Sequence, residues 1–145
     1  MELSCKTKYA LLALLELVTN HQKQEPIQIR QIAKKQNISD RYLEQLLATL
    51  RRGGLVKSQR GAKGGYLLAR EPWKITLLDI VNCLEGSETE NQKSPTLHTP
   101  EQAVVQEIWQ DIDQQIKAQL KQYNLQTLAE QRNSKQQEVD LMYYI

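Results

Sequence analysis

The chain has 145 residues, of which 40% are hydrophobic and 25% are charged, and its mean hydropathy is -0.59. These figures exclude two large domains, and because no apolar run approaches the roughly 18 residues of a membrane span and no signal peptide is recognisable, we expect a cytoplasmic protein. Cys5 and Cys83 are the only cysteines, too few for a disulfide framework or a zinc ribbon within one chain.

Charge is unevenly distributed along the chain. Residues 1–85 carry 14 Lys/Arg and 8 Asp/Glu, whereas residues 86–145 carry 5 and 9, so the first part has a net charge of +6 and the second of -4 within a total of +2. No acidic residue occurs between Glu44 and Glu71, an interval that contains six basic residues. A solvated basic face would explain this bias, and so would contact of the first part with a polyanion such as nucleic acid.

The first part of the chain predicts three helices. Residues 7–20 are apolar on nearly all sides, which is typical of a central helix. Residues 27–29 alternate as in a very short strand, and the helical spacing that follows ends near Asn37. Ser39 is a good N-cap, and the leucine spacing after it predicts an amphipathic helix that stops at residues 53–54.

A β-hairpin is predicted next. Segments 55–59 and 66–70 flank a glycine-rich stretch, residues 60–65, and five of the six glycines lie between positions 53 and 65. Helix, turn, capped amphipathic helix and basic hairpin follow one another as in a winged helix-turn-helix. In that module the second helix of the pair enters the major groove, and the wing reaches phosphates or the minor groove.

The second part of the chain predicts a linker and a long helix. A capping box at Thr76–Asp79 starts a helix that ends near Gly86, and the polar residues after it indicate a loop. The helix expected over residues 101–123 carries an apolar stripe larger than one small domain needs, so we expect a second copy to pack against it. The stripe consists of Val105, Ile108, Trp109, Ile112, Ile116, Leu120 and Tyr123. A short helix from Thr127 and a frayed polar tail complete the chain.

We therefore expect a mainly α fold with a small β-hairpin wing, a winged helix-turn-helix followed by a long C-terminal dimerisation helix. Its parts are a DNA-binding domain (residues 1–85), a sensor loop or linker (86–100), dimerisation helices (101–130) and a tail (131–145).

Two groups of side chains suit DNA recognition. The N-terminal turn of the predicted recognition helix presents Asp40, Arg41, Glu44 and Gln45 away from its leucines, and arginine, glutamine and glutamate can read guanine, adenine and cytosine respectively. Arg60 at the glycine-flanked hairpin tip can enter a narrow minor groove. The complete predicted DNA-binding set is Ser39, Arg41, Tyr42, Glu44, Gln45, Arg51, Lys57, Arg60, Gly61, Lys63, Gly64 and Gly65.

The motifs YLEQLL at positions 42–47 and RGAKGGY at positions 60–66, with Ile32-Ala33 before them, resemble the Rrf-two family of bacterial transcriptional regulators. That family includes the iron-sulfur-biogenesis, nitric-oxide-sensing and cysteine-metabolism repressors, and the resemblance covers about residues 1–130. It implies a homodimer, held by the long helix, that binds a palindromic operator, and repression is the expected role. It also places Arg41, Glu44 and Gln45 at the recognition positions and Arg60 at the wing arginine.

The chain departs from the cluster-binding members of that family. Those members hold an iron-sulfur cluster with three cysteines before the long helix, but here Ala103 stands where the last cysteine would be and Gln106 where a histidine ligand would be. His98 is isolated in a polar stretch, and Cys83 in an apolar helix is more typical of a core residue. We therefore expect no cofactor and no metal site, while an atypical intersubunit cluster using Cys5 or Cys83 remains an alternative.

Other classes of function are less consistent with the sequence. No nucleophile–base pair, paired carboxylates or phosphate loop is recognisable, so we expect no enzymatic activity. A winged-helix module that binds proteins but not DNA would not require the basic bias of residues 1–85. A DNA-binding regulator whose input is a partner protein or a small-molecule effector remains open.

Overall fold

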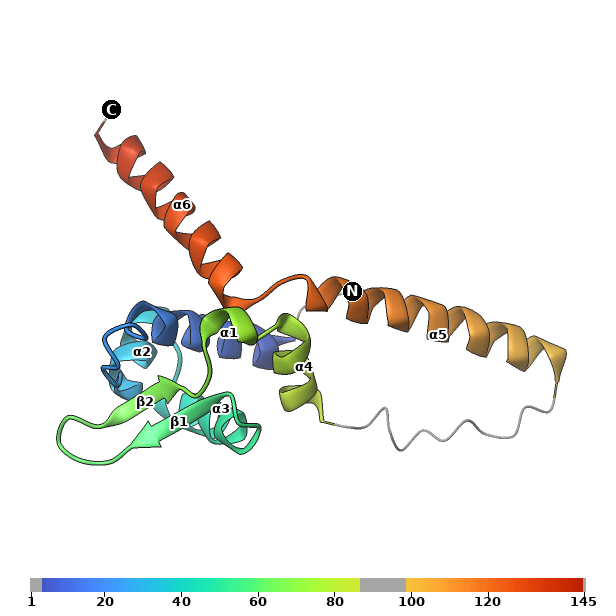
Figure 1. Ribbon diagram of the computed structural model, residues 1–145, viewed down its shortest axis with the longest axis horizontal. Coiled ribbons are helices and arrows are strands. Elements are labelled where there is room, and N and C mark those ends of the chain that lie inside the picture. Colours follow the sequence, from blue (N-terminus) through green and yellow to red (C-terminus); the bar gives the residue numbers. More distant parts are fainter. Residues whose placement is uncertain (1–3, 87–98, 145) are drawn as a thin grey trace.

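The computed structural model describes residues 4–86 and 99–144, and within them the elements follow the predicted order (Figure 1). The two-stranded hairpin lies at one edge of a compact N-terminal body of helices, and two long helices, α5 and α6, lead away from that body in different directions. The elements are α1 (Cys5–Thr19), α2 (Ile29–Gln36), α3 (Asp40–Arg52), β1 (Val56–Gln59), β2 (Gly65–Leu68), the short 3-10 helix η1 (Pro72–Lys74), α4 (Leu77–Glu85), α5 (Pro100–Lys121) and α6 (Leu125–Tyr143).

Local capping determines where the helices start. Ser39 Oγ accepts a hydrogen bond from the backbone N–H of Tyr42 at 3.1 Å, as an N-cap should, and thereby fixes the start of α3. Thr76 and Asp79 form the predicted reciprocal capping box of α4. Asn37 adopts a left-handed conformation with φ of 55°, which ends α2 and produces the turn of the helix pair.

Helix α1 lies at the centre of the body, as its almost uniformly apolar sequence predicted. It contacts α2, α3, α4, β2 and α6, and Ala10, Ala13 and Leu14 on it are completely buried. The buried leucines of α3 pack into the same core, which holds that helix with its polar face outward. Burial of each such leucine stabilises the body by about 1.5–3 kcal/mol.

The hairpin is antiparallel and is attached to the body by a third segment. Val56 pairs with Leu68 and Gln59 with Gly65. Ile27 and Tyr66 exchange backbone hydrogen bonds of 3.0 and 2.8 Å, so the wing is fastened to the turn before α2. The predicted short strand at residues 27–29 is thus reduced to this single bridge, because Ile29 already begins α2.

Of the two C-terminal helices, α6 is longer than the sequence predicted, whereas α5 has nearly the predicted length. The predicted short helix from Thr127 with a frayed tail over residues 131–145 was wrong: α6 is one helix of 19 residues, and its capping box starts at Asn124. Helix α5 matches the predicted long helix. The predicted sensor loop lies outside the described residues at positions 87–98, as does His98.

Two attachments join the long helices to the body. The turn between α5 and α6 is bonded to the segment before α4, through Leu77 N–H to Tyr123 O at 2.9 Å and Leu125 N–H to Ile75 O at 3.0 Å. The N-terminal part of α6, which we call its foot, then contacts α1 and η1. Leu125 and Ala129 in this part are buried. No helix in the described ranges is long and apolar enough to cross a bilayer.

Candidate nucleic-acid interface

Helix α3, the predicted recognition helix, presents the predicted polar residues to solvent. Arg41, Glu44 and Gln45 are exposed, and within the described chain their side chains form no hydrogen bond or ion pair. Tyr42 is placed differently: its half-buried ring packs edge-on against Tyr9, with the ring centroids 5.8 Å apart. Tyr42 therefore helps to anchor α3 to α1, whereas Arg41, Glu44 and Gln45 remain accessible to a ligand.

The wing lies beside α3 (Figure 1) and carries exposed cations. Lys57, Arg60 and Lys63 are exposed, and the described residues offer their side chains no hydrogen-bond or ion-pair partner. Arg51, at the end of α3, donates to Ser58 Oγ of β1 at 3.3 Å and so links the helix to the hairpin. Uncommitted cations of this kind can neutralise phosphates without first breaking internal bonds.

The glycines of the hairpin tip have distinct structural roles. Gly61 is exposed and has a φ of +117°, a conformation that side chains rarely adopt. Gly64 is buried and its N–H donates to Gly61 O at 2.9 Å, while a Cβ at Gly65 would overlap the carbonyl of Ile27. Gly64 and Gly65 therefore shape the tip and fasten it to the body, whereas Arg60 and Lys63 supply its charge.

Helix α5 exposes most of its predicted stripe. No residue of α5 is buried, and Val105, Ile108, Trp109 and Ile112 are 63, 52, 71 and 41% exposed, while Ile116 and Leu120 are half-buried. Val104 adds to this surface and was not predicted. The outer end of α6 is also apolar and exposed, from Leu141 to Tyr144, a feature hidden by the prediction of a frayed tail.

Helix order, the capped recognition helix and the fastened hairpin define a winged helix-turn-helix protein. The family model described as "Rrf2: Iron-dependent Transcriptional regulator" matches residues 3–131. The HTH-type transcriptional regulator CymR of Bacillus subtilis (strain 168) is 38% identical over 146 residues, covering 100% of both chains. The chain thus belongs to the Rrf2 (Rrf-two) family of transcriptional regulators, as the two motifs indicated.

Other relatives agree with this assignment. IscR of Xenorhabdus nematophila is 33% identical over 131 residues, covering 89% of this chain and 79% of that protein. Among solved structures, T. potens IscR has a TM-score of 0.74 at 34% identity and covers 92% of this chain and 88% of its own. The structure titled as CymR, the global cysteine regulator of B. subtilis, has a TM-score of 0.73 at 38% identity and covers 90% and 97%.

The iron in the family description raises the question of ligands. Cys83 Sγ lies 3.5 Å from Thr49 O and packs so closely on Gly53 that a Cβ there would overlap it. Burial raises the pKa of the Cys83 thiol, which disfavours the thiolate that iron requires. The part of the chain described by the structure holds no group of three or more His, Cys, Asp or Glu positioned for a metal ion. Among the described residues, the surroundings of Cys83 thus do not favour iron ligation.

Proposed function

We propose that the protein is a cytoplasmic transcriptional repressor that binds a palindromic operator as a homodimer. Each α3 would lie in a major groove with Arg41, Glu44 and Gln45 toward base edges, and each wing would place Arg60 in the adjacent minor groove. The observation that supports this most is the exposure, on one module, of a polar recognition face and uncommitted basic wing residues. The family assignment supports the same role.

The apolar surface of α5 supports the proposed homodimer. In the described single chain, Val105, Ile108 and Trp109 of its apolar stripe are each more than half exposed, and together they present an area that water solvates poorly. A second copy offers the same stripe, and such a self-complementary contact is the usual basis of twofold dimers. A twofold dimer would read a palindrome with two identical modules.

Binding should depend steeply on salt. If each subunit neutralises roughly three phosphates, a plot of log K against log salt concentration should have a slope of about -5, because counterions leave both half-sites. Fluorescence anisotropy with an operator found by genomic occupancy measures this slope between low and moderate ionic strength. A flat response would contradict the proposed use of the basic wing and α3.

Arg60 and Glu44 should contribute in different ways. Arg60→Ala should weaken binding by about 1–3 kcal/mol, most strongly where the operator flank is A/T-rich and its minor groove narrow. Glu44→Ala should change the preferred base at one operator position more than it changes the overall affinity. Selection from a randomised operator library measures both effects. Lys121→Ala, which removes one charge from α5 far along the chain, is the control; equal losses on every sequence would contradict these separate roles.

We further propose that regulation does not use a three-cysteine iron-sulfur cluster and that the input is a partner protein or a small molecule. Protein purified without oxygen should be colourless and should bind its operator unchanged after chelator treatment. Absorbance spectra and iron and sulfide analysis measure this directly. Stoichiometric iron and sulfide that disappear in Cys5→Ser or Cys83→Ser would establish the alternative, an atypical intersubunit cluster.

A further inference from the structure

A cavity lies where the winged body meets the foot of α6. Its volume is about 510 Å³, within the range of small-molecule sites, and it is lined by the end of α1 and the turn after it, by η1 and by α6. The contacts of α6 with α1 and η1 surround the same place. A molecule bound there would touch both the DNA-binding body and one of the long helices.

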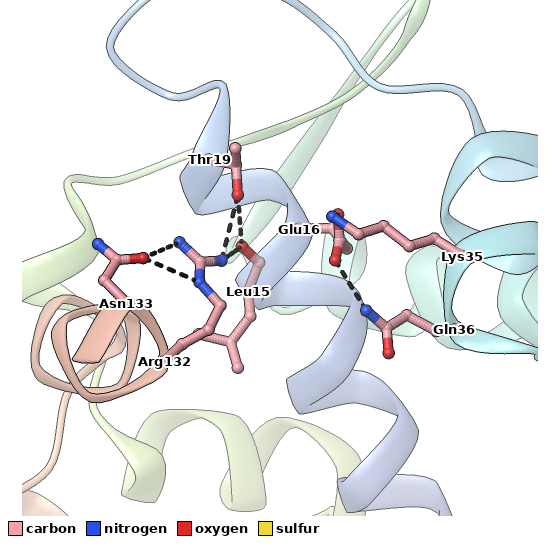
Figure 2. A network of polar contacts seen from close by, with 7 residues as sticks. All are labelled: Leu15, Glu16, Thr19, Lys35, Gln36, Arg132 and Asn133. Atoms are coloured by element: carbon pink, nitrogen blue, oxygen red, sulfur yellow. Dashed lines mark hydrogen bonds and ion pairs between the residues drawn. The ribbon is translucent and has the colours of Figure 1, made fainter. Parts of the chain in front are cut away.

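One wall of this cavity holds a cation without a counter-ion. Arg132 of α6 is half-buried and donates to Leu15 O at 2.8 Å, to Thr19 Oγ1 at 3.1 Å and to Asn133 Oδ1 at 3.3 and 3.2 Å (Figure 2). All of these acceptors are uncharged, and among the described residues no carboxylate pairs with the guanidinium. A half-buried arginine in this state attracts an anionic group.

The other walls supply carboxylates and an aromatic surface. Glu71 Oε2 lies 3.2 Å from His21 Nε2, and Glu130 Oε1 accepts from Gln126 at 3.2 Å. Within the described ranges neither glutamate pairs with a lysine or arginine. The indole of Trp73 is 58% exposed, with the Lys74 ammonium group 5.0 Å from its ring centroid, and it adds an aromatic surface beside the glutamates. Because Glu71 is already engaged by the imidazole, Glu130 is the carboxylate better placed to receive a new cation.

We propose that this cavity binds a small zwitterion of the free amino acid class. Its carboxylate would approach Arg132, its ammonium group would pair with Glu130, and its apolar side chain would lie on Trp73. The two glutamates oppose phosphorylated dianions, and the polar lining opposes pure hydrocarbons. The ligand would bridge the body and α6, and the turn that joins α6 to α5 is bonded to the body. Binding would therefore shift the angle between the body and the long helices, and with α5 the spacing of the two wings; this regulatory part rests on the proposed function.

Binding of a free amino acid in the cavity can be tested without DNA. In the 15N-labelled full chain, the two tryptophans give separate indole N–H signals, which Trp73→Phe assigns. Free L-leucine, L-methionine and L-phenylalanine are titrated to about 10 mM, well above the Kd of about 1 mM that weak binding of about -4 kcal/mol would give. We expect a saturable shift of the Trp73 signal, with the Trp109 signal unchanged.

The charge requirement provides the decisive controls. The N-acetyl and the amide derivatives of the best probe, which each lack one charge, should bind at least about tenfold more weakly, and Glu130→Gln should do the same to the free amino acid. Glu138→Gln, farther along α6, should leave binding unchanged. No shift with any probe, or equal shifts with the two singly charged derivatives or with Glu130→Gln, would overturn the site.

Operator affinity tests the regulatory part separately. Saturating probe should change the operator Kd at least about threefold, whereas binding that leaves this Kd unchanged would overturn regulation through the cavity. If the protein bound no operator either with or without probe, the proposed function would fail while the ligand site stood on its own measurements.

Discussion

Replacing Ile112 and Ile116 together by aspartate is expected to convert the protein into monomers. Burial of two isoleucines in a dimer contributes about 3–6 kcal/mol, and two carboxylates in the same seam would lose hydration without gaining partners. The dimer Kd should therefore rise at least about 100-fold, which sedimentation velocity measures. Operator affinity should fall with it, because one half-site supplies only part of the binding energy.

The fold of the body should survive that double substitution, because no residue of α5 is buried in the single chain. Circular dichroism and the unfolding temperature check this. Gln110→Asp with Gln114→Asp is the matched control, since it adds the same charge to exposed positions on the opposite side of α5. If the isoleucine variant still sedimented as a dimer, the interface would lie elsewhere, for instance on the exposed end of α6.

Gly65→Ala is expected to loosen the wing without affecting the dimer. The new Cβ would overlap the carbonyl of Ile27, so the bridge between Ile27 and Tyr66 would have to open or shift. Such overpacking costs about 1–3 kcal/mol and should lower the unfolding temperature by about 3–10 °C. Operator affinity should fall as well, because Arg60 and Lys63 would no longer be held in a fixed position relative to α3.

The control for this substitution is Ala62→Ser, which adds one atom at an exposed position of the same hairpin. Its unfolding temperature should match that of the unmodified chain, as measured by calorimetry. A Gly65→Ala protein with unchanged stability and unchanged operator affinity would show that the bridge to Ile27 is dispensable for the wing.

The winged body could be predicted because its signals are local. Ser39, the spacing of the leucines after it and the glycines at positions 53–54 fix the start, the buried face and the end of α3 within 13 residues. The hairpin likewise depends on a glycine-rich turn between two apolar segments that are near neighbours in the chain. Short-range patterns of this kind need no knowledge of the tertiary structure.

The foot and the outer part of α6 could not be predicted in this way. Residues 131–138 carry no apolar stripe, yet they contain no glycine or proline and are mostly good helix formers, so the helix continues from its capped start to Tyr143. Arg132 bonds to Leu15 and Thr19, 117 and 113 positions earlier. In the sequence it belongs to a polar run, and only the packing of α6 on α1 shows that it joins the two.

The contact between Gly53 and Cys83 has a consequence for how the sequence can evolve. Any side chain at position 53 would occupy the space that the sulfur now fills, since these residues bring the end of α3 and the last turn of α4 together. A larger residue at position 53 is therefore tolerated only with a smaller residue at position 83, so the two positions should change together in descendants of this chain that lose Gly53. Homologues with a larger residue at 53 should then carry glycine or alanine at 83, and a library randomised at both positions should recover such combinations.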